Sequence, residues 1–340
     1  MNPLVLLATS TGPTQNLSIF DPASPPAESI RHLSVLVFAI TGFIFLVVEG
    51  ILLYAVVRFR RRGAAGTEPP QVYGSKPIEI AWTAAPALIV VVLILVTART
   101  LWEVTPDPPA PRSGDNTLFV TVVGRQWWWE YRYDRYNGRE LGFITANELH
   151  VPASDPGEKG VKRPVYLRLE SADVCHSFWV PRLAGKVDLI PGRTNTLWFQ
   201  TDKPGLYLGQ CAEYCGTQHA GMLLRVNVDA PADFERWLEN QKRKAVEDPA
   251  ARAGKEVFLS QSCVNCHRIR GTPAKGTYAP DLTHLMSRQT LGSGTLKNDE
   301  ATLRQWLLDP QKLRPGCLMP AFRLDDRELR LVVQYLRTLE

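Results

Sequence analysis

The sequence predicts a multidomain membrane protein, in which a hairpin of two membrane-spanning helices is followed by an all-β domain and an all-α domain. Three observations support this fold class. Two long apolar runs lie in the first 100 of 340 residues, many short alternating segments follow, and the last 90 residues carry amphipathic helical patterns. The net charge of +5, from 39 basic and 34 acidic residues, is too small to indicate nucleic-acid binding.

The two apolar runs are long enough to cross a bilayer, which takes about 20 helical residues. Residues 33–57 carry a single charge, Glu49, and residues 80–98 carry none. A buried core helix is one alternative. A cleaved signal peptide is another for the first run, but that run ends in a basic cluster at residues 58–62 without a small-residue cleavage site. We therefore expect residues 33–100 to form a transmembrane hairpin.

The basic residues predict the orientation of this hairpin. The connection 58–77 holds four arginines and Lys76, whereas the N-terminal tail 1–32 holds only Arg31. The positive-inside rule places the connection in the cytoplasm and both chain ends outside. The remainder of the chain is then extracytoplasmic.

The extracytoplasmic part divides into residues 101–229, a helical linker at 230–250, and residues 251–340. A Pro-rich stretch at 104–115 lies near the start of the first of these parts and is expected to serve as a linker. Alternating segments such as 165–169 and 223–228, bounded by Pro, Gly and Asn, predict a sandwich or barrel. Residues 251–262 and 325–339 are amphipathic, so the last part is expected to be all-helical.

A motif for covalent haem attachment opens this last part. Cys263, Cys266 and His267 form C-x-x-C-H. Two thiols one helical turn apart can add to the two vinyl groups of one porphyrin, and the adjacent His can bind its iron. The alternatives are a zinc site or a redox C-x-x-C. Zinc would need a second ligand pair, and a thioredoxin-type motif would need a βαβ setting.

A second axial ligand for the iron is expected downstream. Met319 lies 52 residues after His267, and Met/His ligation suits electron transfer. Met286 and His284 are rival candidates. We interpret Met286 as a packing residue and His284 as a side chain that holds a loop through a hydrogen bond.

The densest cluster of metal-ligand residues is C-x-E-x-C-x3-H-x2-M at residues 211–222. It contains Cys211, Cys215, His219 and Met222, and His176 lies 35 residues before Cys211. Thiolate, imidazole and thioether together favour copper over Mg, Ca or Mn. One blue-copper centre needs a single Cys, so the second thiolate suggests a bridged copper pair.

Charge supports a bridged pair. The two negative charges of the thiolates and the three positive charges of a mixed-valence copper pair sum to one positive charge. Reduction by one electron brings the sum to zero. A Cys211–Cys215 disulfide and a structural zinc site are the alternatives. The disulfide would leave His176, His219 and Met222 without a role, and zinc seldom recruits Met.

Both motifs lie in longer segments that resemble known families. Residues 211–222 resemble the CuA site of cytochrome c oxidase subunit II, and the resemblance extends to GRQWWW at 124–129, DVCHSF at 173–178, DLIPGR at 188–193 and IEIAWT at 78–83. It covers roughly residues 30–228, while residues 251–340 resemble a class I cytochrome c domain. Together they are similar to subunit II of a caa-type bacterial haem–copper oxidase with a fused cytochrome c.

The resemblance implies a cupredoxin-like Greek-key barrel and several residue roles. Glu213 would give its backbone carbonyl to copper and its carboxylate to a Mg site shared with subunit I. Trp127 would be the point of electron entry, and Glu79 would lie at the mouth of a proton path. The side-chain copper ligands implied are His176, Cys211, Cys215, His219 and Met222. Because Trp127, Trp128 and Trp129 should alternate on a strand, a core role is the alternative for Trp127.

The implied function is an electron relay from haem c to CuA and on to subunit I, where oxygen would be reduced with proton pumping. The enzyme is then the whole cytochrome c oxidase, with subunit III as a further partner. The donor would be a cytochrome c or a quinol–cytochrome c reductase, and the location a bacterial inner membrane. The alternatives are a subunit of nitric oxide reductase and a copper-delivery protein. Cys175 and Cys317 are expected to be buried thiols, with a disulfide between them as the alternative.

Overall fold

The computed structural model describes residues 17–60, 71, 73–105, 116–157 and 159–340. These residues fall into two compact units. One is a helical hairpin within residues 28–106, and the other holds the rest of the described chain. Parts of the predicted tail 1–32 and connection 58–77, and most of the stretch 104–115, lie outside the described residues.

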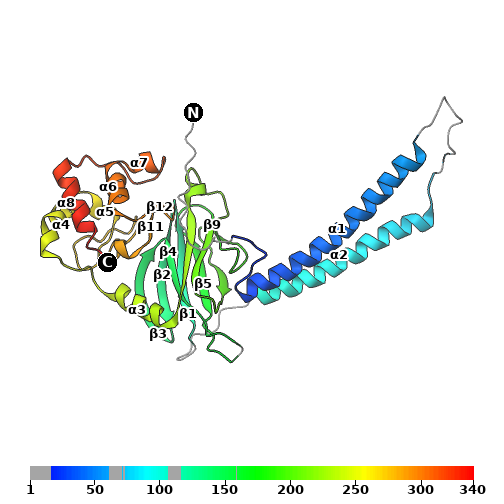
Figure 1. Cartoon of the computed structure of the whole chain (residues 1–340), viewed down its shortest axis with the longest axis horizontal. Helices are drawn as coiled ribbons and strands as arrows, with labels where there is room; N and C mark the ends of the chain where they lie inside the picture. The colour runs from blue at the N-terminus through cyan, green and yellow to red at the C-terminus, as the bar shows by residue number, and fades with distance from the viewer. Residues whose placement is uncertain (1–16, 61–70, 72, 106–115, 158) are drawn as a thin grey trace. The chain divides into compact units, whose positions relative to one another are not determined.

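The hairpin consists of two long helices, α1 (Pro25–Phe59) and α2 (Lys76–Val104). They run side by side, and Ser29 Oγ donates to Glu103 Oε2 at 3.0 Å (Figure 1). Both are longer than the predicted apolar runs, and both are long and apolar enough to cross a membrane. Their most apolar stretches are not buried inside the protein, which argues against the core-helix alternative.

Residues 116–229, here called the β domain, contain two five-stranded sheets. The first sheet has the order β3-β2-β1-β5-β8, with β1 (Leu118–Arg125), β2 (Trp128–Tyr136), β3 (Arg139–Ala146), β5 (Val165–Ser171) and β8 (Asn195–Phe199). The second has the order β4-β10-β9-β6-β7, with β4 (Glu148–Pro152), β6 (His176–Trp179), β7 (Val187–Leu189), β9 (Gly205–Cys211) and β10 (Leu223–Asp229).

The pairing of these strands is mixed. β1 pairs antiparallel with β2 but parallel with β5, and β10 pairs antiparallel with β9 but parallel with β4. Parallel neighbours require the chain to cross between sheets instead of closing every pair with a hairpin. The all-β prediction is confirmed, and the architecture is cupredoxin-like.

The core of the β domain lies between the two sheets. Leu118, Val120 and Val122 alternate along β1 and are fully buried, as are Leu224 and Val226 on β10. Alternate residues of a strand share one face, so these side chains form the inner faces of the two sheets.

Helix α3 (Pro231–Lys242) covers one side of this domain, as the predicted linker helix. Phe234 is fully buried, and its ring meets that of Tyr136 edge-on at 5.2 Å. One turn on, Trp237 packs against Tyr133 at 5.1 Å. The i, i+3 spacing places both aromatics on one helix face, which anchors the linker to the β domain.

Residues 251–340, the C-terminal domain, are mainly helical. The helices are α4 (Arg252–Ser260), α5 (Cys263–Cys266), α6 (Glu300–Leu308), α7 (Pro310–Leu313) and α8 (Asp326–Leu336). The 3-10 turn η3 (Leu285–Ser287) lies in this domain, η2 (Pro249–Ala251) lies at its start, and η1 (His219–Gly221) lies in the β domain. Helices α4 and α8 cross at Gly254, where a Cβ would lie only 2.0 Å from the Leu331 carbonyl oxygen.

The expectation that this domain is entirely helical is wrong at one place. The short strands β11 (Thr290–Leu291) and β12 (Leu296–Lys297) form an antiparallel pair. The turn between them holds Gly292, Ser293 and Gly294, all with positive φ. Gly292 and Gly294 adopt positive φ without the Cβ penalty that Ser293 carries, so two of the turn positions cost little and a tight hairpin can form here.

The packing of α3 yields a stability prediction. Phe234→Ala should destabilise the β domain by about 3–5 kcal/mol, because it removes a fully buried ring and leaves a cavity. We expect a clear fall in the melting temperature of the full chain in detergent, followed by tryptophan fluorescence. Glu235→Ala, on the exposed face of the same helix, is the control and should change little. Equal melting temperatures for the two variants would contradict the anchoring role of α3.

Candidate functional site

The predicted copper ligands meet at one end of the second sheet. His176 is the first residue of β6, and Cys211 is the last of β9. These strands are neighbours, with Phe178 opposite Cys211. The loop after Cys211 returns to the sheet at Met222, whose carbonyl accepts from the Cys211 N–H at 2.9 Å. Residues from three separate segments are thereby gathered at one point.

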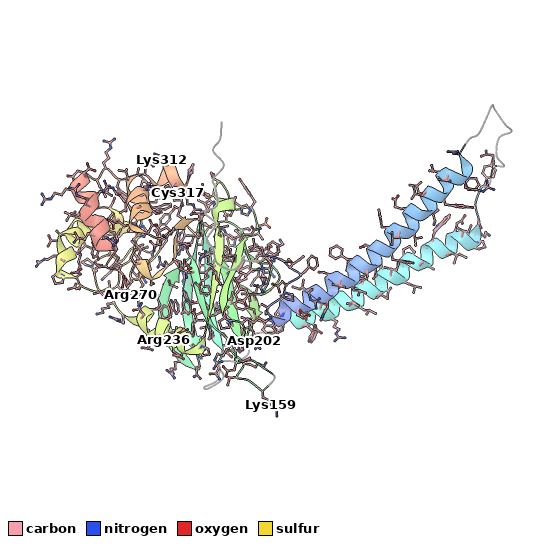
Figure 2. All side chains as sticks on the ribbon, in the orientation of Figure 1. Lys159, Asp202, Arg236, Arg270, Lys312 and Cys317 are labelled. Carbon is pink, nitrogen blue, oxygen red and sulfur yellow. The ribbon has the colours of Figure 1, made fainter. Side chains whose placement is uncertain are left out.

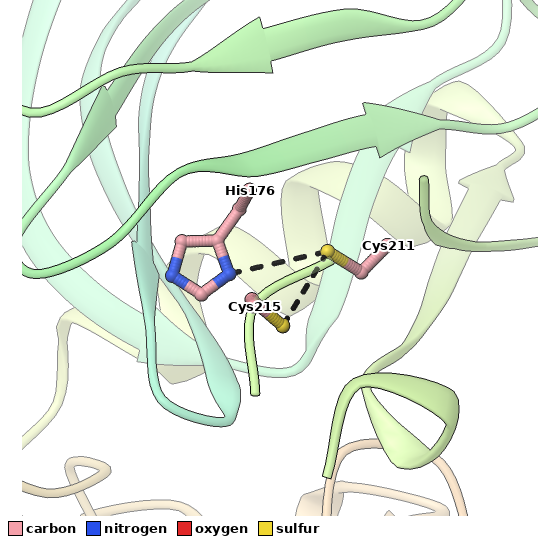
Figure 3. Close-up of side chains that lie close together, drawn as sticks. All are labelled: His176, Cys211 and Cys215. Carbon is pink, nitrogen blue, oxygen red and sulfur yellow. Dashed lines mark hydrogen bonds between the residues drawn. The ribbon is translucent and has the colours of Figure 1, made fainter. Parts of the chain in front are cut away.

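The ligand atoms lie close enough to share a metal centre. The Sγ atoms of Cys211 and Cys215 are 3.8 Å apart, and Cys211 Sγ lies 3.9 Å from His176 Nδ1 (Figure 3). Cys215 Sγ lies 3.6 Å from His219 Nδ1 and 3.9 Å from Met222 Sδ. A disulfide requires about 2.05 Å between sulfurs, so the structure has two free thiols here.

The cluster is buried and electrostatically coupled. His176 and Met222 are fully buried, and Cys211 and Cys215 are nearly so. The hydrogen bond from the Cys215 thiol stabilises the Cys211 thiolate and lowers the pKa of Cys211 to about 3. The same contact raises the pKa of Cys215 well above its usual range. A soft cation beside both sulfurs would replace the shared proton, and the donor set therefore fits copper.

Glu213 meets this cluster through its backbone. Its carbonyl oxygen lies 3.3 Å from Cys211 Sγ, while its side chain is exposed. Among the His, Cys, Asp and Glu side chains of the described residues, those close enough together to hold one metal ion are His176, Cys211 and Cys215. The Glu213 carboxylate is not one of them. The carbonyl role of Glu213 stays a prediction.

Asp173 orients His176. Its Oδ1 lies 2.8 Å from His176 Nε2, and its Oδ2 accepts from the Gln126 N–H at 2.7 Å. Burial opposes ionisation of both groups, but this hydrogen bond prevails and raises the pKa of His176 while lowering that of Asp173. With the proton on Nε2, Nδ1 is left to face Cys211. Gly124 allows the ring to fit, because a Cβ there would lie 2.7 Å from His176 Cδ2.

Trp127 contacts the cluster from outside, but not from a strand. It lies in the turn between β1 and β2, so the prediction that Trp127, Trp128 and Trp129 alternate on one strand is wrong. The turn frees the indole to donate from Nε1 to the Cys215 carbonyl at 2.9 Å, beside a 2.8 Å bond from Gln126 Nε2. Trp129 instead fills the core against His176 and Phe178.

A second site is a cavity lined mainly by the C-terminal domain and closed on one side by the β domain. The side chains that bound it include Cys263, Cys266, His267 and Met319, and Trp127 forms part of its wall. His267 Nδ1 donates to the Pro280 carbonyl at 2.8 Å, which leaves Nε2 available for iron. Burial lowers the pKa of His267 and favours the neutral ring that a metal needs. The residues fit a covalently held haem.

The structure distinguishes among the three candidates for the second axial ligand. Met319 Sδ lines the cavity and accepts from Trp306 Nε1 at 3.1 Å. Both ring nitrogens of His284 are engaged, by the carbonyls of Glu340 and Arg243, so its interpretation as a loop-holding residue is confirmed. Met286 packs against the core of the C-terminal domain, as expected.

Sequence analysis missed two cavity residues, Arg288 and Arg314. Both are nearly fully buried and line the cavity, and burial lowers the pKa of each. Within the described part of the chain, Arg288 Nε has no hydrogen-bond partner. Buried guanidinium groups of this kind suit an anionic group of a bound cofactor. Single arginines in loops carry no sequence pattern that would have identified them.

The remaining predicted residues have structural contacts of their own. Glu79 lies in the first turn of α2, where its carboxylate accepts from the Ser75 N–H at 3.1 Å and satisfies a free donor of the helix end. Cys317 is half-buried and lies beside Gln311 Nε2 at 3.3 Å. Cys175 is exposed, so its predicted burial is wrong, and both cysteines are free thiols. Cys175 lies just before β6 begins, in an exposed loop segment.

Comparison with known proteins covers almost the whole chain. Family models match for the transmembrane domain of cytochrome c oxidase subunit II (residues 13–99), its periplasmic domain (118–228) and cytochrome c (251–340). Cytochrome c oxidase subunit 2 of Alkalihalophilus pseudofirmus is 34% identical, over 99% of this chain and 95% of that protein. The Bacillus subtilis protein of the same name is 30% identical, over 95% and 92%. That of Bacillus sp. PS3 is 33% identical, over 83% and 79%.

The contact between Asp173 and His176 gives a prediction for copper binding. Asp173→Ala should weaken copper binding by roughly 10–100-fold, since it removes the acceptor that fixes the His176 ring. The affinity would be measured on the full chain by competition with a copper chelator of known affinity. Asp202→Ala, an exposed position in the same domain (Figure 2), is the control. Unchanged affinity in Asp173→Ala would show that the ring is held without this carboxylate.

Proposed function

The chain belongs to the cytochrome c oxidase subunit II family, and on this premise we propose that it relays single electrons from a covalent haem c to a dinuclear CuA centre in a terminal oxidase. One observation carries the proposal. Trp127 lines the haem cavity and also donates to the carbonyl of Cys215 in the copper cluster. When bound, the haem and the copper pair would each accept and release one electron.

The residues of the copper cluster have distinct proposed roles. The Cys211 and Cys215 thiolates, the His176 and His219 rings and the Met222 thioether would hold the copper, and the copper would supply one-electron redox chemistry. The Glu213 carbonyl completes the set. The 3.8 Å separation of the sulfurs and the burial of the site support these assignments. Buried, crowded ligands allow little rearrangement between redox states.

In the C-terminal domain we assign haem attachment to Cys263 and Cys266 and axial ligation to His267 and Met319. Pro280 and Trp306 hold these two ligands through the hydrogen bonds described above. Arg288 and Arg314 would face the carboxylates of the haem. The positive charge of the two guanidinium groups would offset the negative charge of those carboxylates.

The oxygen-reducing site is proposed to lie in subunit I, because residues 33–57 and 80–98 contain no His to bind a haem there. As subunit II, the chain is part of a membrane complex with subunit I and contributes electron transfer to its oxidase activity. We further propose that the complex lies in a bacterial inner membrane with subunit III and receives electrons from a donor such as cytochrome c or a quinol–cytochrome c reductase. We also propose Mg at the Glu213 carboxylate and a place for Glu79 at a proton path. The exposed Glu213 carboxylate is compatible with a shared site.

The alternatives are less well supported. A CuA-bearing subunit of a nitric oxide reductase would share the copper cluster, but the three relatives described above are all cytochrome c oxidase subunits. A copper-delivery protein needs exposed, exchangeable ligands, whereas Cys211, Cys215 and Met222 are buried.

Optical spectra of the purified full chain test the proposal. Oxidised protein should show a c-type haem band and a near-infrared copper band, and dithionite should bleach the latter. Cys215→Ser should lose the near-infrared band and keep the haem band. Cys266→Ala should disturb covalent haem attachment and keep the copper band. Absence of the near-infrared band in copper-replete wild-type protein would refute the relay.

The position of Trp127 predicts its effect on the relay. Trp127→Phe should slow haem-to-copper electron transfer by roughly tenfold or more, because it removes the indole N–H bond to Cys215 in a contact that must be well positioned. The rate would be followed after flash reduction of the haem. Trp198→Phe, on β8 of the same domain, is the control. Equal rates in the two variants would assign Trp127 a packing role alone.

A further inference from the structure

A buried carboxylate of the β domain has its hydrogen-bond donors in the C-terminal domain. Glu148, the first residue of β4, is 2% exposed. Its carboxylate accepts from the Gln289 N–H at 3.0 Å, from the Thr290 N–H at 2.9 Å and from Thr290 Oγ1 at 2.6 Å. Arg225 on β10 flanks this contact, with Nε 3.6 Å from Glu148 and Nη2 donating to Gln289 Oε1 at 2.8 Å.

The contact continues along the edge of β10 toward the copper cluster. The Leu223 N–H donates to the Ser293 carbonyl at 3.1 Å, and Leu223 directly follows the ligand Met222. At Gly294, φ is +87° and a Cβ would lie 3.2 Å from Leu223 Cβ. The β11–β12 turn is therefore shaped to lie against β10.

A second contact joins the copper-ligand loop to the haem cavity. Gln218 lies next to the ligand His219, and its Nε2 donates to the Pro315 carbonyl at 2.6 Å. Arg314 returns two bonds, from Nε to Gln218 Oε1 and from Nη2 to the Gly221 carbonyl, both at 3.1 Å. Arg314 also lines the cavity, so one side chain contacts both sites.

The linker between the domains is fixed at both ends. Its helix α3 is anchored to the β domain by Phe234 and Trp237. Beyond α3, the Ala245 N–H donates to the Arg270 carbonyl at 3.0 Å, and His284 Nε2 lies 3.1 Å from the Arg243 carbonyl. Neither end of the linker is free to swing.

A buried carboxylate that loses its donors carries a large desolvation penalty. A shift of the C-terminal domain that kept Glu148 covered would leave its carboxylate buried without Gln289 and Thr290, and full separation would expose a surface shaped for β11–β12. The docked arrangement is thus part of the folded state, unlike the mobile arrangement that is the default between domains of one chain.

We propose that Glu148 is a positioning residue that locks the C-terminal domain on the β domain, so that electrons pass from haem to copper in one fixed docking geometry. This inference rests on the proposed relay. It adds that the relay involves no transient encounter between donor and acceptor, and that the wall formed by Trp127 stays in place through turnover.

Hydrogen exchange of the full chain, read by mass spectrometry, tests the lock itself. Glu148→Ala should raise the exchange rate of peptides covering residues 289–290 and 223 by tenfold or more, while peptides from α8 and β1 stay as in wild type. Glu140→Ala, an exposed position on β3, is the matched control. Unchanged exchange at 289–290 in Glu148→Ala would overturn the proposal.

Electron transfer tests the positioning role. After flash reduction of the haem, the wild-type rate should be independent of added glycerol, whereas in Glu148→Ala it should fall at least tenfold and decrease with viscosity. A wild-type rate that already decreases with viscosity, or a variant with raised exchange and an unchanged transfer rate, would overturn the role. Missing haem or copper bands in wild-type protein would refute the relay instead, and the exchange result would still report on docking.

A milder variant guards against misfolding of Glu148→Ala. Thr290→Val keeps the shape of the side chain and removes only the Oγ1 donor to Glu148. It should change exchange and transfer rate in the same directions by a smaller factor. No change in either quantity for Thr290→Val, with Glu148→Ala unfolded, would also count against the lock.

Discussion

The closure of one loop is the constraint on which both sites depend. The Cys211 N–H bond to the Met222 carbonyl ends the pairing of β9 with β10, so the ten residues between them must turn back over the end of the sheet. Cys215 and His219 lie on this loop, and the pairing of β6 with β9 sets His176 beside it. Trp127, which lines the cavity, hydrogen-bonds to this loop at Cys215, and Gln218, a residue of the loop, hydrogen-bonds to the C-terminal domain. A slip of one residue in β9 would turn Cys211 away from the cluster and undo all of these contacts.

Charge determines what this loop can hold. The paired thiols release one proton easily, because each stabilises the anion of the other, and the second only when a cation takes its place. Asp173 orients the His176 ring toward the cluster. Its carboxylate contacts Nε2 and therefore does not lie among the sulfurs. On the other side of Trp127, the buried side chains of Arg288 and Arg314 favour the binding of a negatively charged group. The cavity is thus suited to an anionic cofactor and the cluster to a cationic one, and the indole lies between them.

The sequence was informative where the chemistry is local and uninformative where it is not. The C-x-x-C-H and C-x-E-x-C-x3-H-x2-M spacings predicted groups that the structure brings together, because each motif spans only a turn or a loop. Trp127 was misplaced because a run of three aromatics resembles a strand, whereas the β1–β2 register opposes Arg125 to Trp128 and leaves Trp127 in the turn. Cys175 was expected to be buried from residue type alone, but it lies in the loop before β6 and is exposed. Glu148 could not have been found, since its partners lie 141 and 142 residues away in the chain.

The long-range contact of Glu148 distinguishes a fixed docking geometry from covalent linkage alone. Covalent linkage raises the effective concentration of the donor near its acceptor, but it sets no orientation, and a freely tethered cytochrome would still have to find its docking geometry for each electron. Surface charge pairs guide such a search at small energetic gain. Here Glu148, the acid that contacts the C-terminal domain, is 2% exposed, and its donors are mostly backbone N–H groups. Recognition therefore depends on the folded shape of β11 and not on the charge of a surface. The contact between the two domains at Glu148 therefore lies in the interior of the protein and not on its surface. Its stability then belongs to the free energy of folding, and salt should affect it far less than it affects an encounter between separate proteins.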